Sequence, residues 1–168
     1  MRSSLVGSEM CIRDSTVGVL VQCNYNWEGK SLRLGDQWVS KKLPVGEHCY
    51  TDDTIAPKKP WFPFCSGAEL IKDGPARDGS IIVVIATDAP VLPHQLKRVA
   101  KRPALSLGRL GAISTPGSGD TFVAFSTGNT GALSEDQFTR VEQFPNNALS
   151  ELFRGTVQAT EEAIINAM

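Results

Sequence analysis

The sequence predicts an α+β domain, because segments with the period of strands and segments with the period of helices both occur along the chain. The clearest strand is the apolar run at residues 80–87, whose β-branched residues are typical of a strand covered on both faces. The clearest helix covers residues 147–168, where apolar side chains recur every three or four positions. A chain of 168 residues with 41% hydrophobic content is of a size to hold one domain.

Two strand-like segments flank a polar turn in the first part of the chain. Residues 16–23 predict a buried strand, and residues 31–34 predict a short strand that pairs with it as a hairpin. Residues 37–78 are rich in proline and show no sustained period, so we expect a long surface segment there.

Two short helices are expected after the central strand. In residues 93–100, Leu96 and Val99 lie on one apolar side, with basic residues around the rest. Pro103 has no backbone N–H to donate, so the helix must kink or begin anew there, and the glycines within residues 108–111 then end it.

The last third of the chain predicts a turn, a strand and the long helix. Residues 117–119, Gly-Ser-Gly, predict a tight turn before a strand at residues 121–126. Asn147 is a residue type that caps helices, so we expect the final helix to begin there. The side chains expected on its buried face are Leu149, Leu152, Phe153, Val157 and Ile164.

Residues 1–15 differ from the rest of the chain. They show neither helical nor strand periodicity, and reverse translation of residues 4–15 gives a sequence that resembles a transposase adapter used to prepare sequencing libraries. We therefore expect this segment to be non-native and outside the fold, with the natural chain cut upstream of residue 16. The final helix carries no stop signal, so we expect the chain to be cut there as well.

Composition and charge argue against several classes of function. The formal net charge of −1 gives no electrostatic basis for binding nucleic acid or an anionic membrane. No apolar run approaches the roughly 20 residues that span a bilayer, and no signal peptide is visible. Because the true N-terminus is expected to be missing, both cytoplasm and periplasm stay open. His48, Cys49 and Cys65 match no standard zinc spacing, so we expect no metal. The odd number of scattered cysteines outside residues 1–15, Cys23, Cys49 and Cys65, argues against a disulfide framework.

Ser80 has an unusual place, because it begins the most apolar strand and follows Gly79. A serine hydroxyl is a weak nucleophile without a base beside it, and a serine at the start of a chain can use its own α-amine, which titrates at about pH 8. Attack of the Ser80 hydroxyl on the Gly79 carbonyl, followed by hydrolysis of the ester, would release that amine. The residues alone also allow a plain Asp-Gly-Ser turn.

Two nearby motifs suggest other chemistry. Asp88 and His94 follow Ser80 in the sequence and suggest a Ser-His-Asp triad, but Pro90 turns the chain away. The Gly-Ser-Gly of residues 117–119 suggests a phosphate-binding loop but lacks the following lysine. We expect neither motif to carry the function.

The wider pattern resembles one family. Four blocks, VGVLVQCNYN, GSIIVVIATDAPVLPHQLKRVAKR, GSGDTFVAFSTGN and ATEEAI, closely resemble peptidase family S58 in content and order. These are self-processing aminopeptidases that include the L-aminopeptidase/D-amidase-esterase and the β-peptidyl aminopeptidases. The resemblance covers most of residues 16–168 and is weakest across the proline-rich segment.

The resemblance implies a role for each candidate site residue. Ser80 matches the nucleophile, and Gly79 with Ser80 matches the self-cleavage junction. Ser118 matches a serine that hydrogen-bonds the new amine or the nucleophile, and Asp120 matches an acidic position, often Glu, that orients this network. Asn24 matches a donor to the oxyanion. From the residues alone, Ser118 and Asp120 also suit a turn, and Asn24 suits the end of a strand.

The resemblance also implies the architecture and the reaction. The fold is a four-layer αββα sandwich, here partial, with residues 16–79 as the C-terminal part of an α chain and residues 80–168 as the N-terminal and central part of a β chain. The reaction releases an N-terminal amino acid from a short peptide, amide or ester and needs no cofactor. The intact protein is expected to be a homo-oligomer of cleaved α/β protomers, with no nucleic-acid or membrane partner.

Three alternatives remain at this point. A related acyltransferase of arginine biosynthesis shares the fold and the self-cleavage but uses threonine as its nucleophile, so Ser80 argues against it. A non-catalytic scaffold protein would keep the chain uncleaved. The chain of 168 residues by itself is expected to be inactive, because its sheets would lack partners.

Overall fold

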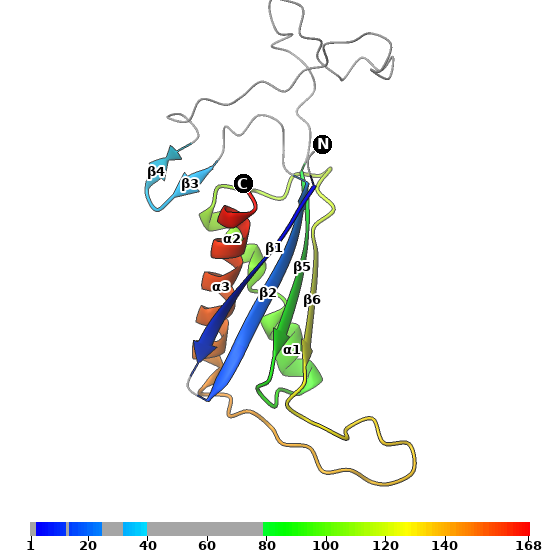
Figure 1. Ribbon diagram of the computed structural model, residues 1–168. Coiled ribbons are helices and arrows are strands. Elements are labelled where there is room, and N and C mark those ends of the chain that lie inside the picture. The colour runs from blue at the N-terminus through cyan, green and yellow to red at the C-terminus, as the bar shows by residue number, and fades with distance from the viewer. Residues whose placement is uncertain (1–2, 13, 25–31, 40–78) are drawn as a thin grey trace, which may run out of the picture.

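The computed structural model describes residues 3–12, 14–24, 32–39 and 79–168, and it contains a four-stranded sheet with helices on one face (Figure 1). The expected α+β class is confirmed. The order of strands in the sheet is β1-β2-β5-β6, in which β1 and β2 are antiparallel, β2 and β5 are antiparallel, and β5 and β6 are parallel. The strands are β1 (Ser3–Ile12), β2 (Ser15–Asn24), β5 (Ser80–Thr87) and β6 (Thr121–Ser126).

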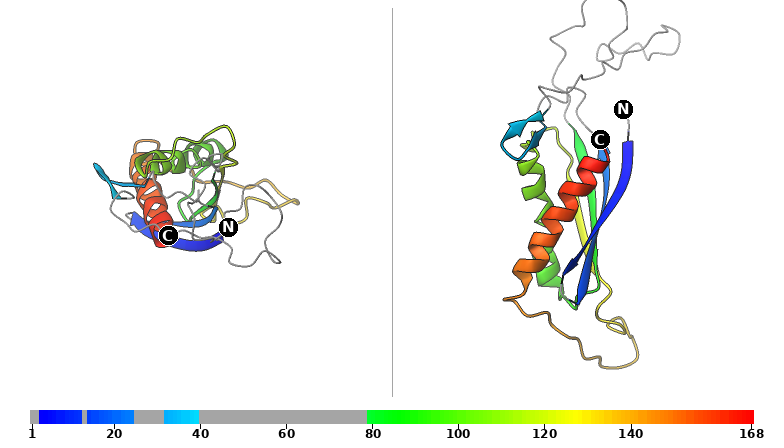
Figure 2. Two further views of the ribbon diagram at one scale, coloured as in Figure 1. Left: turned by 90° about the horizontal axis from the view of Figure 1, so that it is seen from above. Right: turned by 60° about the vertical axis from the view of Figure 1, so that its left-hand side comes forward.

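The helices all cover the same face of the sheet, as the view from above shows (Figure 2). Helices α1 (Pro93–Val99) and α2 (Pro103–Arg109) form the crossover between the parallel strands β5 and β6. Helix α3 (Leu149–Asn166) packs against β1 and β2. Pro103 is the first residue of α2, so of the two expected outcomes the chain begins a new helix there.

The core lies between the helices and the sheet. Alternate residues of β2 and β5 point to the helices and are buried, as the period of two for a strand requires. Gly155 lets α3 approach the sheet closely, because a Cβ there would overlap Ile12 and lie 3.2 Å from Val17 Cγ1. The buried apolar residues of these three elements are Val17, Val19, Val21, Cys23, Ile81, Val83, Ile85, Leu149, Leu152, Ala159, Ala163 and Ile164.

The opposite face of the sheet is apolar but exposed. Leu20, Ile82, Val123 and Phe125 lie on it, and each is between 42% and 48% exposed. The expectation that residues 80–87 are covered on both faces is therefore not met by the described residues. The four-stranded sheet and the helices on its face form two layers, so the part of the chain that the structure describes accounts for two of the expected four.

The first strand corrects one expectation. Residues 1–15 were expected to lie outside the fold, but β1 pairs with β2 from Ser3 opposite Asn24 to Ile12 opposite Ser15. A ladder of backbone hydrogen bonds does not require an alternating sequence, so the missing periodicity was a poor guide here. The pairing does not bear on the origin of the segment, and the adapter interpretation stays a prediction.

The expected hairpin between residues 16–23 and 31–34 is also wrong. The short strand β3 (Arg33–Leu34) pairs instead with β4 (Gln37–Trp38), around Gly35, whose φ is 64°. A positive φ suits glycine, and it allows the tight turn that joins these two strands. Most of the expected surface segment, residues 40–78, lies outside the described residues.

Two details of α3 differ from the prediction. The N-cap is Ala148 rather than Asn147, and the amides of Ala148 and Leu149 donate to the carbonyls of Pro145 and Asn146. Phe153 and Val157 are half-buried, because they face α2 across a groove rather than the sheet.

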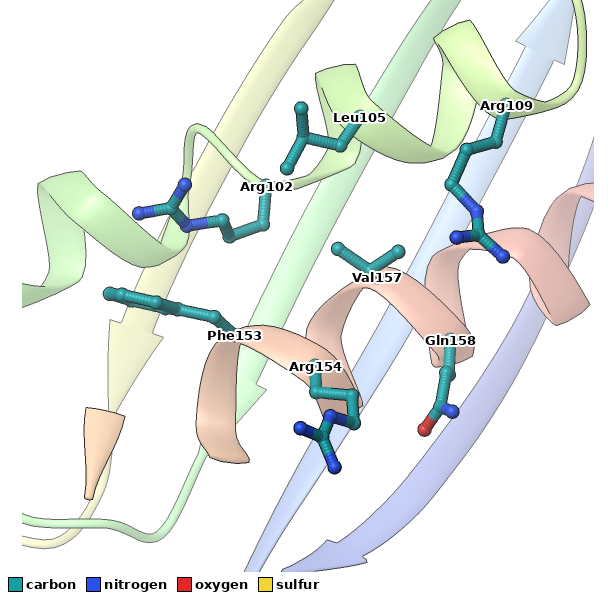
Figure 3. Close-up of a pocket in the computed structure, with 7 residues that line it drawn as sticks. All are labelled: Arg102, Leu105, Arg109, Phe153, Arg154, Val157 and Gln158. Carbon is teal, nitrogen blue, oxygen red and sulfur yellow. The ribbon is translucent and has the colours of Figure 1, made fainter. Parts of the chain in front are cut away.

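That groove has a volume of about 510 Å³ and lies between α2 and α3 (Figure 3). The Arg102 guanidinium stacks on the Phe153 ring at 3.9 Å from its centroid, and Arg109 pairs with Glu161. The residues that line it are Arg102, Leu105, Arg109, Phe153, Arg154, Val157 and Gln158. None of the candidate site residues lies in it.

Candidate active site

Three neighbouring strands start or stop at the same end of the sheet, and each carries a candidate residue there. Ser80 begins β5, Asn24 ends β2, and Asp120 immediately precedes β6. Asn24 and Ser80 are directly opposite each other in the antiparallel ladder. Opposite residues of such a pair extend to the same face, so both side chains lie on the face turned away from the helices.

The Ser80 hydroxyl is held by a backbone amide. The Gly119 N–H donates to Ser80 Oγ at 3.0 Å, and Ser80 itself is half-buried. A turn delivers this amide, since the Ser118 N–H donates to the Thr115 carbonyl at 2.8 Å across Pro116. Proline fixes φ at the value this turn position needs. A Cβ at Gly119 would lie 3.4 Å from Ser80 Oγ, so the backbone passes close to the hydroxyl.

Asp120 accepts three hydrogen bonds. Its Oδ1 accepts from Ser118 Oγ at 2.7 Å and from the Ile81 N–H at 3.2 Å. Its Oδ2 accepts from Ser114 Oγ at 3.0 Å. The carboxylate thereby connects the turn to the backbone of β5 one residue after Ser80. The shorter side chain of aspartate, where the resembled family often has glutamate, reaches both Ser118 and β5.

The structure places the predicted residues Ser80, Ser118 and Asp120 at one site, where Ser118 bonds to Asp120 and the Gly119 amide between them bonds to Ser80, with Asn24 opposite Ser80 in the ladder. Sequence reasoning missed the Gly119 and Ile81 amides, because a backbone N–H carries no sequence signal of its own. It also missed Ser114, which lies in an irregular segment with no motif to mark it.

The alternative Ser-His-Asp triad is not assembled. Asp88 follows Thr87, which at about 3.3 Å per residue is roughly 23 Å from Ser80 at the far end of β5, and Asp88 Oδ1 accepts from the Thr16 N–H at 2.6 Å. His94 is exposed on α1. A triad of these residues with Ser80 does not form.

Within the described ranges, no group of three or more His, Cys, Asp and Glu side chains could hold a metal ion. His48, Cys49 and Cys65, at which we expect no zinc site, lie outside those ranges. No helix among residues 79–168 or the shorter described ranges is long and apolar enough to cross a membrane.

Comparison with known proteins gives consistent matches. Beta-peptidyl aminopeptidase BapA from Sphingosinicella microcystinivorans is 43% identical over 166 residues, which are 95% of this chain and 38% of that protein. A beta-aminopeptidase from Burkholderia sp. is similar in structure, with a TM-score of 0.69 and 32% identity, over 99% of this chain and 42% of that one. The l-aminopeptidase d-ala-esterase/amidase from Ochrobactrum anthropi has a TM-score of 0.69 and 28% identity, over 98% and 39%.

The chain thus spans about two fifths of the length of these relatives. The model of peptidase family S58 matches residues 3–168, which include the strand ends, the turn and all three helices described above. Because family model, relatives and solved structures agree over nearly the whole chain, it belongs to peptidase family S58.

Proposed function

We propose that this chain carries the catalytic centre of a self-cleaving aminopeptidase in which Ser80 becomes an N-terminal nucleophile. The observation that carries the proposal is the hydrogen bond from the Gly119 amide to Ser80 Oγ, beside the pair formed by Ser118 and Asp120. A serine that merely starts a strand needs no such neighbours. The similarity to enzymes named as aminopeptidases supports the same conclusion and does not favour the acyltransferase or scaffold alternatives.

Self-cleavage would proceed in two steps. Ser80 Oγ attacks the carbonyl carbon of Gly79, the bond from that carbon to the Ser80 nitrogen breaks, and an ester forms. Water then hydrolyses the ester and leaves a carboxylate on Gly79 and a free amine on Ser80. On this proposal residues 16–79 end the α chain and residues 80–168 begin the β chain.

Turnover would reuse the same atoms. Ser80 Oγ attacks the carbonyl of the substrate's first residue while the Ser80 amine takes the hydroxyl proton. The Ser118 hydroxyl, which donates to Asp120, has oxygen lone pairs left to accept a hydrogen bond from that amine. Asn24, opposite Ser80 in the ladder, would donate to the oxyanion, a contact worth about 3 kcal/mol in other hydrolases. The bond from the carbonyl carbon to the leaving amine or alcohol then breaks as the Ser80 ammonium gives its proton to that group. Water finally hydrolyses the acyl-enzyme, which releases the acid and restores the Ser80 hydroxyl.

We propose short peptides, amides or esters as substrates, with β-amino residues at the N-terminus among those accepted. Two of the similar proteins are named for β-residues and one for L- and D-residues, so the names favour β-residues without excluding the others. Assembly into a homo-oligomer of cleaved protomers is part of the same proposal, and sedimentation velocity would check it.

The proposal is tested by the intact mass of the full-length protein and of its Ser80→Ala variant. We expect two fragments that meet between Gly79 and Ser80 in the first, and one uncleaved chain in the second. Ser150→Ala, an exposed serine on α3, is the matched control and should cleave normally. Release of p-nitroaniline from β-homoalanine, L-alanine and D-alanine anilides then measures the substrate preference. An uncleaved but folded wild-type chain would contradict the mechanism.

A further inference from the structure

Ser114 has a backbone conformation that its residue type disfavours. Its φ is 48°, and among the described residues it is the one non-glycine residue with a positive φ. In this left-handed region the Cβ of an L-residue crowds the following carbonyl, and only glycine, asparagine and aspartate adopt it readily. Such conformations cost free energy and persist where surrounding contacts fix them, often at functional sites.

The side chain of Ser114 is used by the candidate active site. Its Oγ donates to Asp120 Oδ2 at 3.0 Å, while Asp120 Oδ1 accepts from Ser118 and from the Ile81 amide. Donors on both oxygens fix the plane of the carboxylate, since it cannot rotate without breaking bonds on both sides. With the Ser114 hydroxyl removed, water would compete for Oδ2 and the carboxylate could turn.

A purely structural purpose accounts poorly for this arrangement. Ser114 is exposed, and an exposed hydrogen bond between two side chains adds little to the free energy of unfolding. The turn that follows is already closed by the bond from the Ser118 amide to the Thr115 carbonyl. Glycine at position 114 would adopt the same backbone without strain. The hydroxyl is therefore the feature that glycine would not supply.

We propose that Ser114 is a positioning residue that orients Asp120, so that Ser118 keeps its proton toward Asp120 and its lone pairs toward the Ser80 amine. This inference rests on the proposed role of Ser80. It assigns a purpose to the strained backbone, because the left-handed conformation is what brings the hydroxyl to Asp120. Ser114 would act through Asp120 and would not touch the substrate.

The test compares Ser114→Gly with Ser114→Asn in the full-length protein. Glycine relieves the strain and removes the donor, so we expect an unchanged or higher melting temperature and a kcat lower by about tenfold, with KM changed less than about twofold. Asparagine tolerates the left-handed backbone and supplies an amide donor, so kcat should return to within about threefold of wild type. Ser134→Gly, in an exposed loop, is the matched control.

A second comparison separates an effect of Ser114 through Asp120 from a general loss of activity. In an Asp120→Asn background, Ser114→Gly should have little further effect on kcat, because both changes remove the same interaction. Wild-type kcat in Ser114→Gly would overturn the inference and leave the proposed function intact. A loss that Ser114→Asn does not relieve, or one that follows a fall in melting temperature, would also overturn it. A wild-type protein that neither cleaves itself nor releases p-nitroaniline would overturn both.

Discussion

The two ends of β5 carry the same kinds of residue but use them differently. Near Thr87, the hydroxyls of Thr87 and Ser126 and the carboxylate of Asp88 bond to the backbone. Thr87 Oγ1 donates to the Thr16 carbonyl at 2.8 Å and accepts from the Ala89 N–H at 3.1 Å. Ser126 Oγ donates to the Ala89 carbonyl at 2.5 Å and accepts from the Gly128 N–H at 3.0 Å. These bonds hold the path of the chain where strands end.

Near Ser80, side chains bond to one another as well as to backbone amides. Ser118 and Ser114 both donate to Asp120, and the Ser80 hydroxyl accepts from Gly119. The bonds between side chains orient the groups of the candidate site, and the bonds from the Gly119 and Ile81 amides connect the turn to the start of β5. Both ends combine serine, aspartate and glycine in a turn, so residue types alone do not distinguish the structural end of β5, near Thr87, from the end with the proposed chemistry, near Ser80, which we call the chemical end. The partners of each hydroxyl do, and substitutions at the two ends should therefore affect different measurements.

The largest effect on stability is expected from Gly128→Ala at the structural end. A Cβ there would overlap the Asp88 carbonyl oxygen and lie 2.6 Å from the Pro90 nitrogen, and backbone atoms cannot move away easily. We expect a loss of about 3 kcal/mol in the free energy of unfolding, at the upper end for overpacking. Urea denaturation of the Ser80→Ala form, which is expected to remain one chain, measures it. A loss below about 0.5 kcal/mol would mean that the backbone at Gly128 is not rigidly packed against residues 88–90.

Ser118→Ala at the chemical end should have the reverse profile, with a large effect on self-cleavage and a small effect on stability. The change removes a donor to Asp120 and the proposed acceptor for the Ser80 amine, so we expect self-cleavage to slow by roughly 100-fold, or about 2.7 kcal/mol in the barrier. The free energy of unfolding should change by less than about 0.5 kcal/mol. Timed mass spectrometry after purification follows the cleavage. Normal cleavage in this variant would assign Ser118 to the turn alone.

Thr87→Val should have a smaller effect, confined to stability. Valine keeps the shape of threonine but leaves the Thr16 carbonyl and the Ala89 amide without their shared partner. A cost of about 1.5 kcal/mol is expected for two backbone groups that lose one hydroxyl. The melting temperature should fall while the cleavage rate well below it stays normal. Slowed cleavage in this variant would show that the two ends of β5 are coupled.

The sequence predicted the elements whose signals are local. The β-branched run of β5, the strand at Thr121–Ser126 and the interruption at Pro103 follow from side-chain shape and from the missing proline N–H, although the sequence left a kink and a new helix both open at Pro103. It did not predict β1, because that strand forms on the free edge of β2 through backbone pairing. Nor did it predict that Phe153 would face α2, because the choice of face depends on where the neighbouring helices lie.

The candidate site divides in the same way. Ser80, Ser118 and Asp120 were predicted because the resemblance to a family marks side chains. The Gly119 and Ile81 amides and the strained Ser114 were not found, because their roles arise from the course of the backbone. Asn24 lies opposite Ser80 only through the register of β2 with β5, which no local pattern fixes.

The smallest effect is expected from Gly119→Ala. This substitution repeats near Ser80 the change made at Gly128, so the two variants can be compared directly. Here the added Cβ would lie 3.4 Å from Ser80 Oγ and 4.0 Å from Ser80 Cβ, which are ordinary contacts, and the backbone amide is kept. Stability should therefore change by less than about 0.5 kcal/mol. The new methyl group would crowd the approach to the Ser80 hydroxyl, so self-cleavage should slow by about threefold to fivefold, or less than about 1 kcal/mol. Two identical substitutions with opposite profiles would assign stability to one end of β5 and chemistry to the other, whereas a large loss of stability at Gly119 would make both ends structural.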